Sequence, residues 1–161
     1  MEIVKNVRPP SGLSRVLFRL PIHLYERGLG WVFGHRMLLL NHVGRVTGKP
    51  RQVVLEVVER DARDGSYVVV SGWGSTAAWY RNVQHTPEVT IQTGRSTVPV
   101  TAVPVPTEEG ADVMARYGAK HRTAAKFLLP RVMGYKVDGS VADFRAVGRQ
   151  MPFIRFVPRE S

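Results

Sequence analysis

Three cations, one hydroxyl and two glycines lie close together in the stretch GRVTGKPR, residues 44–51. Glycine lets backbone N–H groups approach a ligand, and arginine, lysine and threonine side chains donate hydrogen bonds to phosphate or carboxylate oxygens. The side-chain donors are Arg45, Thr47, Lys49 and Arg51. The stretch therefore predicts an anion-binding turn, with a solvated hairpin turn as the alternative.

This stretch does not fit the phosphate loop of nucleoside triphosphatases. That loop needs four residues between its glycines, whereas Gly44 and Gly48 enclose only Arg, Val and Thr. Pro50 stands where the loop needs a serine or threonine to bind magnesium, and a strand-like pattern follows instead of a helix. We therefore exclude nucleoside triphosphate hydrolysis.

Residues 72–77, GWGSTA, match the G-x-G-x-x-A pattern of dinucleotide-binding folds, between a predicted strand and a predicted helix. The bulky Trp73 and the absence of an acidic residue at the end of the next strand argue against that function. The backbone donors of this turn leave a ligand anion there as an open alternative.

Other side-chain chemistry is poorly supported. The histidines form no i,i+4 pair, so we expect no metal site, and the absence of cysteine excludes disulfides and thiolate chemistry. Glu56 and Glu59 lie three apart on a predicted strand and should face opposite ways, which makes them a poor acid/base pair. The reactive atoms of an enzyme would then belong to a bound organic cofactor.

Runs of β-branched residues predict strands between residues 37 and 105. They occupy 37–43, 52–59, 66–72, 88–94 and 96–105. Valines on both faces of the second run predict a strand covered on both sides, by a barrel interior and by a helix or partner chain. Pro99 and Pro104 predict an edge or bulged last strand, because proline cannot donate to a ladder.

Helical patterns surround these strands. An amphipathic helix is predicted within residues 11–33, packed on the core or, alternatively, lying on anionic lipid. A mid-chain helix should occupy 75–87, capped by Ser75 or Thr76 and stopped by Pro87. Further helices are predicted over 107–121 and over 140–150, the latter with a Ser140–Asp143 cap, followed by a closing strand over 152–158.

The chain has 161 residues, of which 43% are hydrophobic, and this suits one domain, residues 1–161. Its parts are an N-terminal helix region (1–36), a barrel core (37–105) and a helical C-terminal region (106–161). The net charge of +10 favours an acidic partner: nucleic acid, an anionic membrane or a phosphorylated small molecule. No interleaved aromatic pattern is present, so we expect no nucleic acid. We read no signal peptide and expect a cytoplasmic protein, with membrane association as an alternative.

Three segments together resemble the deazaflavin-dependent nitroreductase family. They are LLLNHVGRVTGKPR, YVVVSGWG and AAWYRNVQHTPEV, although Val46 stands where that family carries a cation and Ala78 where it carries proline. The resemblance covers residues 37 to about 105. It implies an α+β split β-barrel of the FMN-binding type, a homodimer, and the deazaflavin coenzyme F420.

The resemblance also implies cofactor-binding residues in four groups. The anion turn would bind the phosphate and oligoglutamate end of the coenzyme, through Arg45, Thr47, Lys49 and Arg51. The next strand would run along the cofactor, with Gln52, Val53 and Val54. Val70, Ser71 and Gly72 would line the deazaflavin ring, and the helix would close the pocket with Trp79, Tyr80 and Asn82. Ordinary core packing is the alternative for Trp79 and Tyr80. No catalytic side chain is predicted.

The resulting hypothesis is an F420H2-dependent reductase. It transfers hydride between the deazaflavin C5 and an electron-poor, hydrophobic small molecule such as a quinone, a nitroaromatic or an activated alkene. The alternatives are an FMN-dependent oxidoreductase on the same barrel and a protein that carries F420 or a lipid without turnover.

Overall fold

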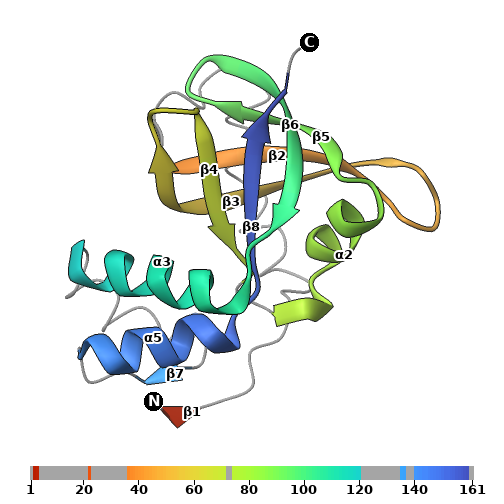
Figure 1. Ribbon diagram of the computed structural model, residues 1–161. Helices are drawn as coiled ribbons and strands as arrows, with labels where there is room; N and C mark the ends of the chain where they lie inside the picture. Colours follow the sequence, from red (N-terminus) through yellow and green to blue (C-terminus); the bar gives the residue numbers. More distant parts are fainter. Residues whose placement is uncertain are drawn as a thin grey trace.

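A closed barrel forms the centre of the computed structural model, which describes residues 2–3, 22, 36–71, 74–120, 135–136 and 140–159. The strand order around it is β2-β3-β4-β8-β6-β5, and every neighbouring pair is antiparallel (Figure 1). The strands are β2 (Met37–Val43), β3 (Pro50–Asp61), β4 (Ser66–Val70), β5 (Glu88–Thr93), β6 (Ser96–Pro104) and β8 (Phe153–Pro158). Two short strands, β1 (Glu2–Ile3) and β7 (Tyr135–Lys136), pair separately.

Two helices, α3 (Thr107–Lys120) and α5 (Val141–Gln150), pack side by side at one end of the barrel. A short 3-10 turn, η2 (Gly74–Thr76), leads into α2 (Ala78–His85) on another side (Figure 1). The predicted cap of α5 is confirmed, since Ser140 Oγ accepts from the Asp143 N–H at 3.1 Å. The predicted cap of α2 is wrong: Ala77 is the N-cap and makes no side-chain bond, because Ser75 and Thr76 belong to η2. None of the described helices is long and apolar enough to cross a membrane.

Strand β4 is buried on both faces. Tyr67 and Val69 point into the barrel, where they join residues such as Leu40 and Phe156. The alternating residues, Val68 among them, point outward into a second cluster that α3 and α5 cover. Helices α3 and α5 therefore cover the outer face of this strand with apolar side chains.

Strand β3 is also covered on both sides, as its valines predicted. Val53 packs toward the barrel interior, whereas Val54 points outward against Leu39 and Ile22. Farther along the strand, Val58 joins the cluster under α3. Apart from Ile22, the amphipathic helix predicted within residues 11–33 lies outside the described residues.

The prolines of β6 do not make it an edge strand, so that prediction is wrong. The strand pairs with β5 through its first part and with β8 through its last part. Pro99 lies opposite Thr90 of β5, before the ladder to β8 begins, and Pro104 lies opposite Ile154, after the ladder to β5 has ended. Each proline thus occupies a stretch of the strand with a single neighbouring strand, where a missing N–H is tolerated.

The prediction that Glu56 and Glu59 face opposite ways is also wrong. The register of β3 against β4 shifts between Val57 and Glu59, which marks a β-bulge. Beyond the bulge the alternation is offset by one residue, so both carboxylates reach α3. Glu56 accepts from the Tyr117 hydroxyl at 2.9 Å, and Glu59 accepts from Arg116 at 3.0 and 3.1 Å. These groups therefore dock the helix on the strand.

Candidate functional site

The connection between β2 and β3 is a compact turn that its glycines make possible. The Gly44 N–H donates to the Lys49 carbonyl at 2.9 Å, and the Gly48 N–H donates to the Gly44 carbonyl at 2.8 Å. Gly48 has φ of +68°, which disfavours any side chain, and a Cβ on Gly44 would lie 2.7 Å from Thr47 Oγ1. Thr47 Oγ1 accepts from the Lys49 N–H at 3.2 Å and keeps its own proton for another partner.

The turn carries positive charge that no carboxylate neutralises among the residues whose side chains the structure describes. Among the residues that the structure describes, Arg45, Lys49 and Arg51 form no ion pair. Lys49 and Arg51 are exposed, and Val46 projects from the turn with 89% of its surface accessible. Cations without acidic partners favour binding of an external anion.

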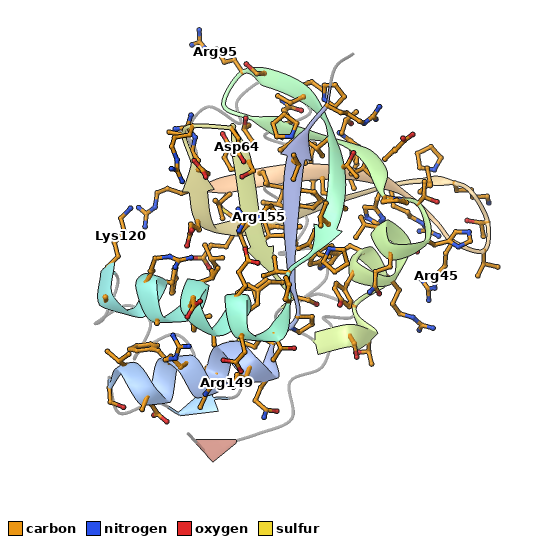
Figure 2. All side chains as sticks on the ribbon, in the orientation of Figure 1. Arg45, Asp64, Arg95, Lys120, Arg149 and Arg155 are labelled. Carbon is orange, nitrogen blue, oxygen red and sulfur yellow. The ribbon has the colours of Figure 1, made fainter. Side chains whose placement is uncertain are left out.

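Helix α2 holds this turn through one buried amide. Asn82 Oδ1 accepts from the Arg45 backbone N–H at 3.1 Å and from Arg45 Nη1 at 2.9 Å. Asn82 Nδ2 lies 3.1 Å from Nδ1 of His42, which is itself buried at the end of β2. Burial, followed by the positive charge of Arg51, lowers the pKa of His42 from 6.5 to about 4. Figure 2 shows Arg45 beside α2, well apart from Arg149 on α5.

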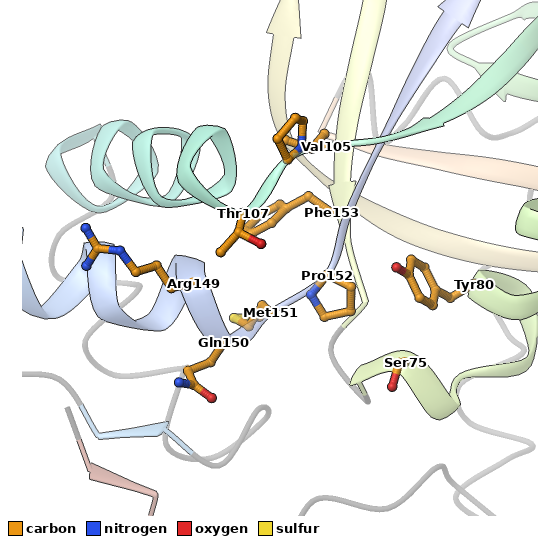
Figure 3. Close-up of a pocket in the computed structure, with 10 residues that line it drawn as sticks. Ser75, Tyr80, Val105, Thr107, Arg149, Gln150, Met151, Pro152 and Phe153 are labelled. Carbon is orange, nitrogen blue, oxygen red and sulfur yellow. The ribbon is translucent and has the colours of Figure 1, made fainter.

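A pocket of about 300 Å³ opens on another side of α2 (Figure 3). Its walls come from η2 and α2, from the connection between β6 and α3 with the first residue of α3, and from the end of α5 through the first residue of β8. The lining residues are Ser75, Tyr80, Val105, Pro106, Thr107, Arg149, Gln150, Met151, Pro152 and Phe153. In Figure 3 the Tyr80 ring faces Pro152 across the pocket. The exposed lining is largely polar, at Ser75, Thr107, Arg149 and Gln150, whereas Met151 and Phe153 are almost fully buried, and this suits a small organic ligand that carries polar groups.

The end of β4 abuts this pocket. Ser71 is buried, and its backbone N–H donates to the carbonyl of Pro152, a wall residue, at 3.0 Å. Val70 points outward into the cluster beneath α3 and α5. Gly72 lies outside the described residues. Of the residues predicted to surround the cofactor ring, Ser71 is therefore adjacent to the pocket through its backbone, and Tyr80 lines it.

The remaining predicted residues separate into different environments. Trp79 is buried in the barrel core and meets the Tyr80 ring edge-on, with centroids 5.9 Å apart. Gln52 lies on the outer face of β3 and donates to Asn41 at 3.0 Å. Val53 and Val54 point to opposite faces of β3, since side chains alternate along a strand. The structure thus joins Asn82 to the anion turn. The side chains of Val54 and Val70 point out of the barrel into other clusters.

Two features of the site were missed by sequence reasoning. His42 was considered only as a metal ligand, although its position one residue before the end of β2 places it beside the turn. The pocket walls at Arg149 to Phe153 belong to a segment with no chemical motif. For His42, the alternation of β2 was a usable signal, because it places His42 on the same inward face as Leu38 and Leu40. The pocket walls had no comparable signal.

The closed antiparallel barrel with helices on its outside defines the class of this protein, the split β-barrel of the FMN-binding type. A pyridoxamine 5'-phosphate oxidase-related, FMN-binding protein from Nostoc punctiforme PCC 73102 shares this fold. The TM-score is 0.52 at 14% identity, over 85% of this chain and 77% of that chain. A protein described as a domain-swapped dimer gives a TM-score of 0.51 at 22% identity, over 90% of this chain and 99% of that chain. At these identities the likeness carries the fold alone.

Residues 18–126 match the model of the F420H(2)-dependent quinone reductase family. The match spans more than half of the chain, and the chain belongs to this family. A solved F420-H2 dependent reductase, FDR-A, is also similar, at 24% identity and a TM-score of 0.49, over 76% of this chain and 95% of that chain. No curated protein matches the chain significantly. The predictions of a deazaflavin-dependent oxidoreductase and of coenzyme F420 are confirmed.

The anion turn fits the acidic end of this coenzyme. A phosphate and a glutamate tail require several cationic or N–H donors that are not already neutralised. Arg45, Lys49 and Arg51 meet that requirement among the described residues, and Gly44 keeps the turn free of a Cβ that would strike Thr47. The residues present are therefore compatible with F420.

Proposed function

We propose that this protein is an F420H2-dependent reductase whose acceptor is a small hydrophobic molecule such as a quinone, a nitroaromatic or an activated alkene. The observation that carries the proposal is that one helix, α2, contacts both the anion turn and the pocket. Asn82 of α2 holds the unneutralised anion turn, and Tyr80 of the same helix lines the pocket. The helix thus connects a site for the acidic end of the coenzyme with a site for an organic ring.

Within this proposal, Arg45, Thr47, Lys49 and Arg51 bind the phosphate and glutamate groups. Ser71 and Gly72 flank the ring, and Trp79 supports Tyr80 from the barrel core. Val53 contributes from the inner face of β3, whereas the outward positions of Val54 and Val70 leave them a supporting role. Charge-assisted hydrogen bonds at the turn fix the coenzyme's position before the acceptor enters.

The coenzyme supplies the chemistry, a hydride carried at C5 of the deazaflavin. The protein's residues orient the acceptor and exclude water. Val105 and Tyr80 supply apolar surface in a lining that also includes Thr107, Arg149 and Gln150, and a quinone, with an apolar ring and polar oxygens, suits such a mixed surface. In this proposal the Tyr80 hydroxyl donates a hydrogen bond to an acceptor oxygen. Reduction of a quinone adds one hydride and one proton. Because no protein nucleophile or metal takes part in this scheme, loss of one polar residue should slow turnover without abolishing it.

A purified sample tests this function directly. Reduced F420 is mixed with a panel containing a quinone, a nitroaromatic and an activated alkene, and the visible band of the oxidised coenzyme is followed. We expect acceptor-dependent oxidation, and no activity with NADPH in place of F420H2. Tight F420 binding without oxidation by any acceptor would support the carrier alternative. Copurification of a flavin with FMN-dependent turnover would support the FMN alternative.

We propose further that the protein is a homodimer. The similarity to a protein described as a domain-swapped dimer, over 90% of this chain, supports this arrangement. Light scattering of the purified protein should give twice the mass of one chain. A monomer that still turns over would remove the dimer from the proposed function and leave the site unchanged.

A further inference from the structure

The buried amide of Asn82 has a single possible orientation. Its oxygen accepts two hydrogen bonds from Arg45, one from the backbone N–H and one from Nη1. A reversed amide would set its NH2 group against two donors, which is unfavourable. The Asn82 nitrogen therefore faces His42, 3.1 Å from Nδ1.

This orientation determines the protonation state of His42. Asn82 Nδ2 is a donor, so Nδ1 of His42 must accept, and the ring is neutral with its proton on Nε2. The surroundings agree, because the side chains of both residues are buried. The charged group whose field acts on His42, among the described residues, is Arg51 from β3, and its positive charge also disfavours a second proton.

The contact between Asn82 and Arg45 differs chemically from the arginine contacts of the helical layer, although Arg159 is likewise held by neutral oxygens, the backbone carbonyls of Val100 and Val89. Arg116, Arg149 and Arg155 are oriented by carboxylates, with N–O distances of 3.0, 2.9 and 2.8 Å. Arg45 is instead oriented by a neutral amide. An amide fixes the guanidinium without cancelling its charge, and it occupies only part of the guanidinium's donors. The remaining donors and the full positive charge stay available for a ligand.

We propose that His42 and Asn82 are positioning residues for the anion turn. Neutral His42 fixes the Asn82 amide, and Asn82 fixes the backbone and guanidinium of Arg45, so that the turn is ordered and still fully charged when its ligand arrives. The proposal rests on the proposed function, because the ligand it serves is the acidic end of the coenzyme.

The variant Asn82→Asp tests both links at once. The carboxylate neutralises Arg45, and it replaces the donor that faces His42 Nδ1 with an acceptor, which favours a protonated ring. In the protein without coenzyme, NMR titration should show the His42 pKa raised by about one unit or more. The affinity for F420 and for inorganic pyrophosphate, measured by calorimetry, should fall by about tenfold or more. The matched control is Gln92→Glu, which makes the same amide-to-carboxylate change on β5 opposite Leu39, on the outer face of the barrel wall, whereas His42 has the inward alternation of Leu40, and it should change neither result.

A second pair of variants separates positioning from folding. His42→Asn leaves an acceptor near the place of Nδ1, whereas His42→Leu removes it. We expect pyrophosphate affinity within about threefold of wild type for His42→Asn and about tenfold weaker for His42→Leu, since only the latter leaves the Asn82 donor unpaired. Circular dichroism checks that both variants are folded, and an unfolded His42→Leu would leave the decision to Asn82→Asp.

The outcomes distinguish the two proposals. An unchanged His42 pKa in Asn82→Asp, or unchanged pyrophosphate affinity, overturns the positioning role. Asn82-dependent binding of pyrophosphate by a protein that does not bind F420 would retain the positioning role and overturn the proposed function.

Discussion

The arginines of the helical layer and those of the anion turn have opposite environments. On α3, α5 and β8, arginine side chains meet carboxylates: Glu59 pairs with Arg116, Asp112 with Arg145, Glu108 with Arg149 and Glu109 with Arg155. At the turn, Arg45 meets an amide, and Lys49 and Arg51 meet no carboxylate among the described residues. Among the described residues, the positive charge of the helical layer is therefore offset by carboxylates, whereas that of the turn is not.

The two regions also differ in how they are held together. The helical layer packs through apolar side chains and close backbone contact, with Phe144 and Val147 of α5 fully buried against α3. The turn is held by one amide and by its own backbone hydrogen bonds. The first arrangement maximises stability, and the second leaves charged groups available. Changes in the two regions should therefore affect different properties.

The largest expected effect is on coenzyme binding when the turn loses its cations. Each change of Arg45, Lys49 or Arg51 to Ala should weaken F420 binding by about 1 to 3 kcal/mol, and the triple variant by about 4 kcal/mol or more, as charge-assisted hydrogen bonds are lost. Calorimetry measures the affinities, and binding should also weaken with added salt. The control Arg145→Ala removes a paired cation and should leave affinity unchanged. Unchanged affinity in all three single variants would move the site elsewhere.

The next effect is on stability at acid pH. The pH range in which stability is lost differs between the turn, where His42 titrates, and the helical layer, where Glu108 titrates. The pKa of His42 falls from 6.5 to about 4 through burial and the charge of Arg51, so the unfolded chain binds more protons than the folded one between these values. The free energy of unfolding should therefore decrease from about pH 6.5 to about pH 4, by up to about 3 kcal/mol. In the helical layer, hydrogen bonds and charge from Arg149 lower the pKa of Glu108 below its usual 4.5, so its contribution is lost only below that pH.

Denaturant unfolding at several pH values measures this dependence. The control is His42→Asn, which removes the titrating group and should flatten the profile above pH 4.5. A wild-type profile that is already flat between pH 6.5 and pH 4.5 would show that His42 titrates normally in the folded protein.

Much of this fold could be predicted from local patterns. The runs of β-branched residues marked the barrel strands, and Ser140 with Asp143 marked the start of α5. Two errors came from long-range pairing: the ladder that changes partner along β6 and the bulge near Glu59 depend on neighbouring strands that no local pattern reveals. The third, the cap of α2, was local, because Ser75 and Thr76 form the separate turn η2. Strand pairing is a tertiary property, and it overrides local preference.

The candidate site was predictable in part for the same reason. Donors clustered in sequence, such as Arg45, Thr47 and Lys49, remain clustered in the fold because a turn keeps them together. The contact between Arg45 and Asn82 joins residues 37 apart, and the pocket joins α2 to the far end of the chain. Neither has a local signature. Val53 and Val54 were predicted to lie along the cofactor together, and the structure shows that their side chains face opposite sides of β3, while the predicted role itself stays a prediction.

A moderate effect on stability alone should follow from a change where α3 and α5 touch. A Cβ on Gly148 would lie 2.6 Å from the Gly110 carbonyl oxygen and 2.7 Å from Ala111 Cα, so the helices must separate. Gly148→Ala should lower the free energy of unfolding by about 2 kcal/mol, less than the full overpacking penalty because alanine favours the helix. Thermal or denaturant unfolding measures the loss.

The control for this change is Ala142→Ser, an exposed position on the same helix that should stay within about 0.5 kcal/mol of wild type. The affinity of Gly148→Ala for F420 should be unchanged under conditions where the protein is folded. A large loss of affinity with little loss of stability would mean that the helical layer shapes the coenzyme site directly.

The smallest effect should come from an ion pair of the helical layer. Arg116 and Glu59 join α3 to β3 at 3.0 Å, but their side chains are 57% and 28% exposed, so water screens the pair. Arg116→Gln should lower the free energy of unfolding by less than about 1 kcal/mol and leave F420 affinity unchanged. The matched variant Arg51→Gln makes the same chemical change at the anion turn, where no carboxylate is lost, and should weaken binding by about 1 kcal/mol or more. Calorimetry at equal salt measures the F420 affinity of both variants. It shows whether the position of the lost charge matters or only the net charge of the molecule. Equal losses of affinity would mean that the net charge of the molecule, rather than the unneutralised turn, attracts the coenzyme, whereas a loss confined to Arg51→Gln assigns the attraction to the turn.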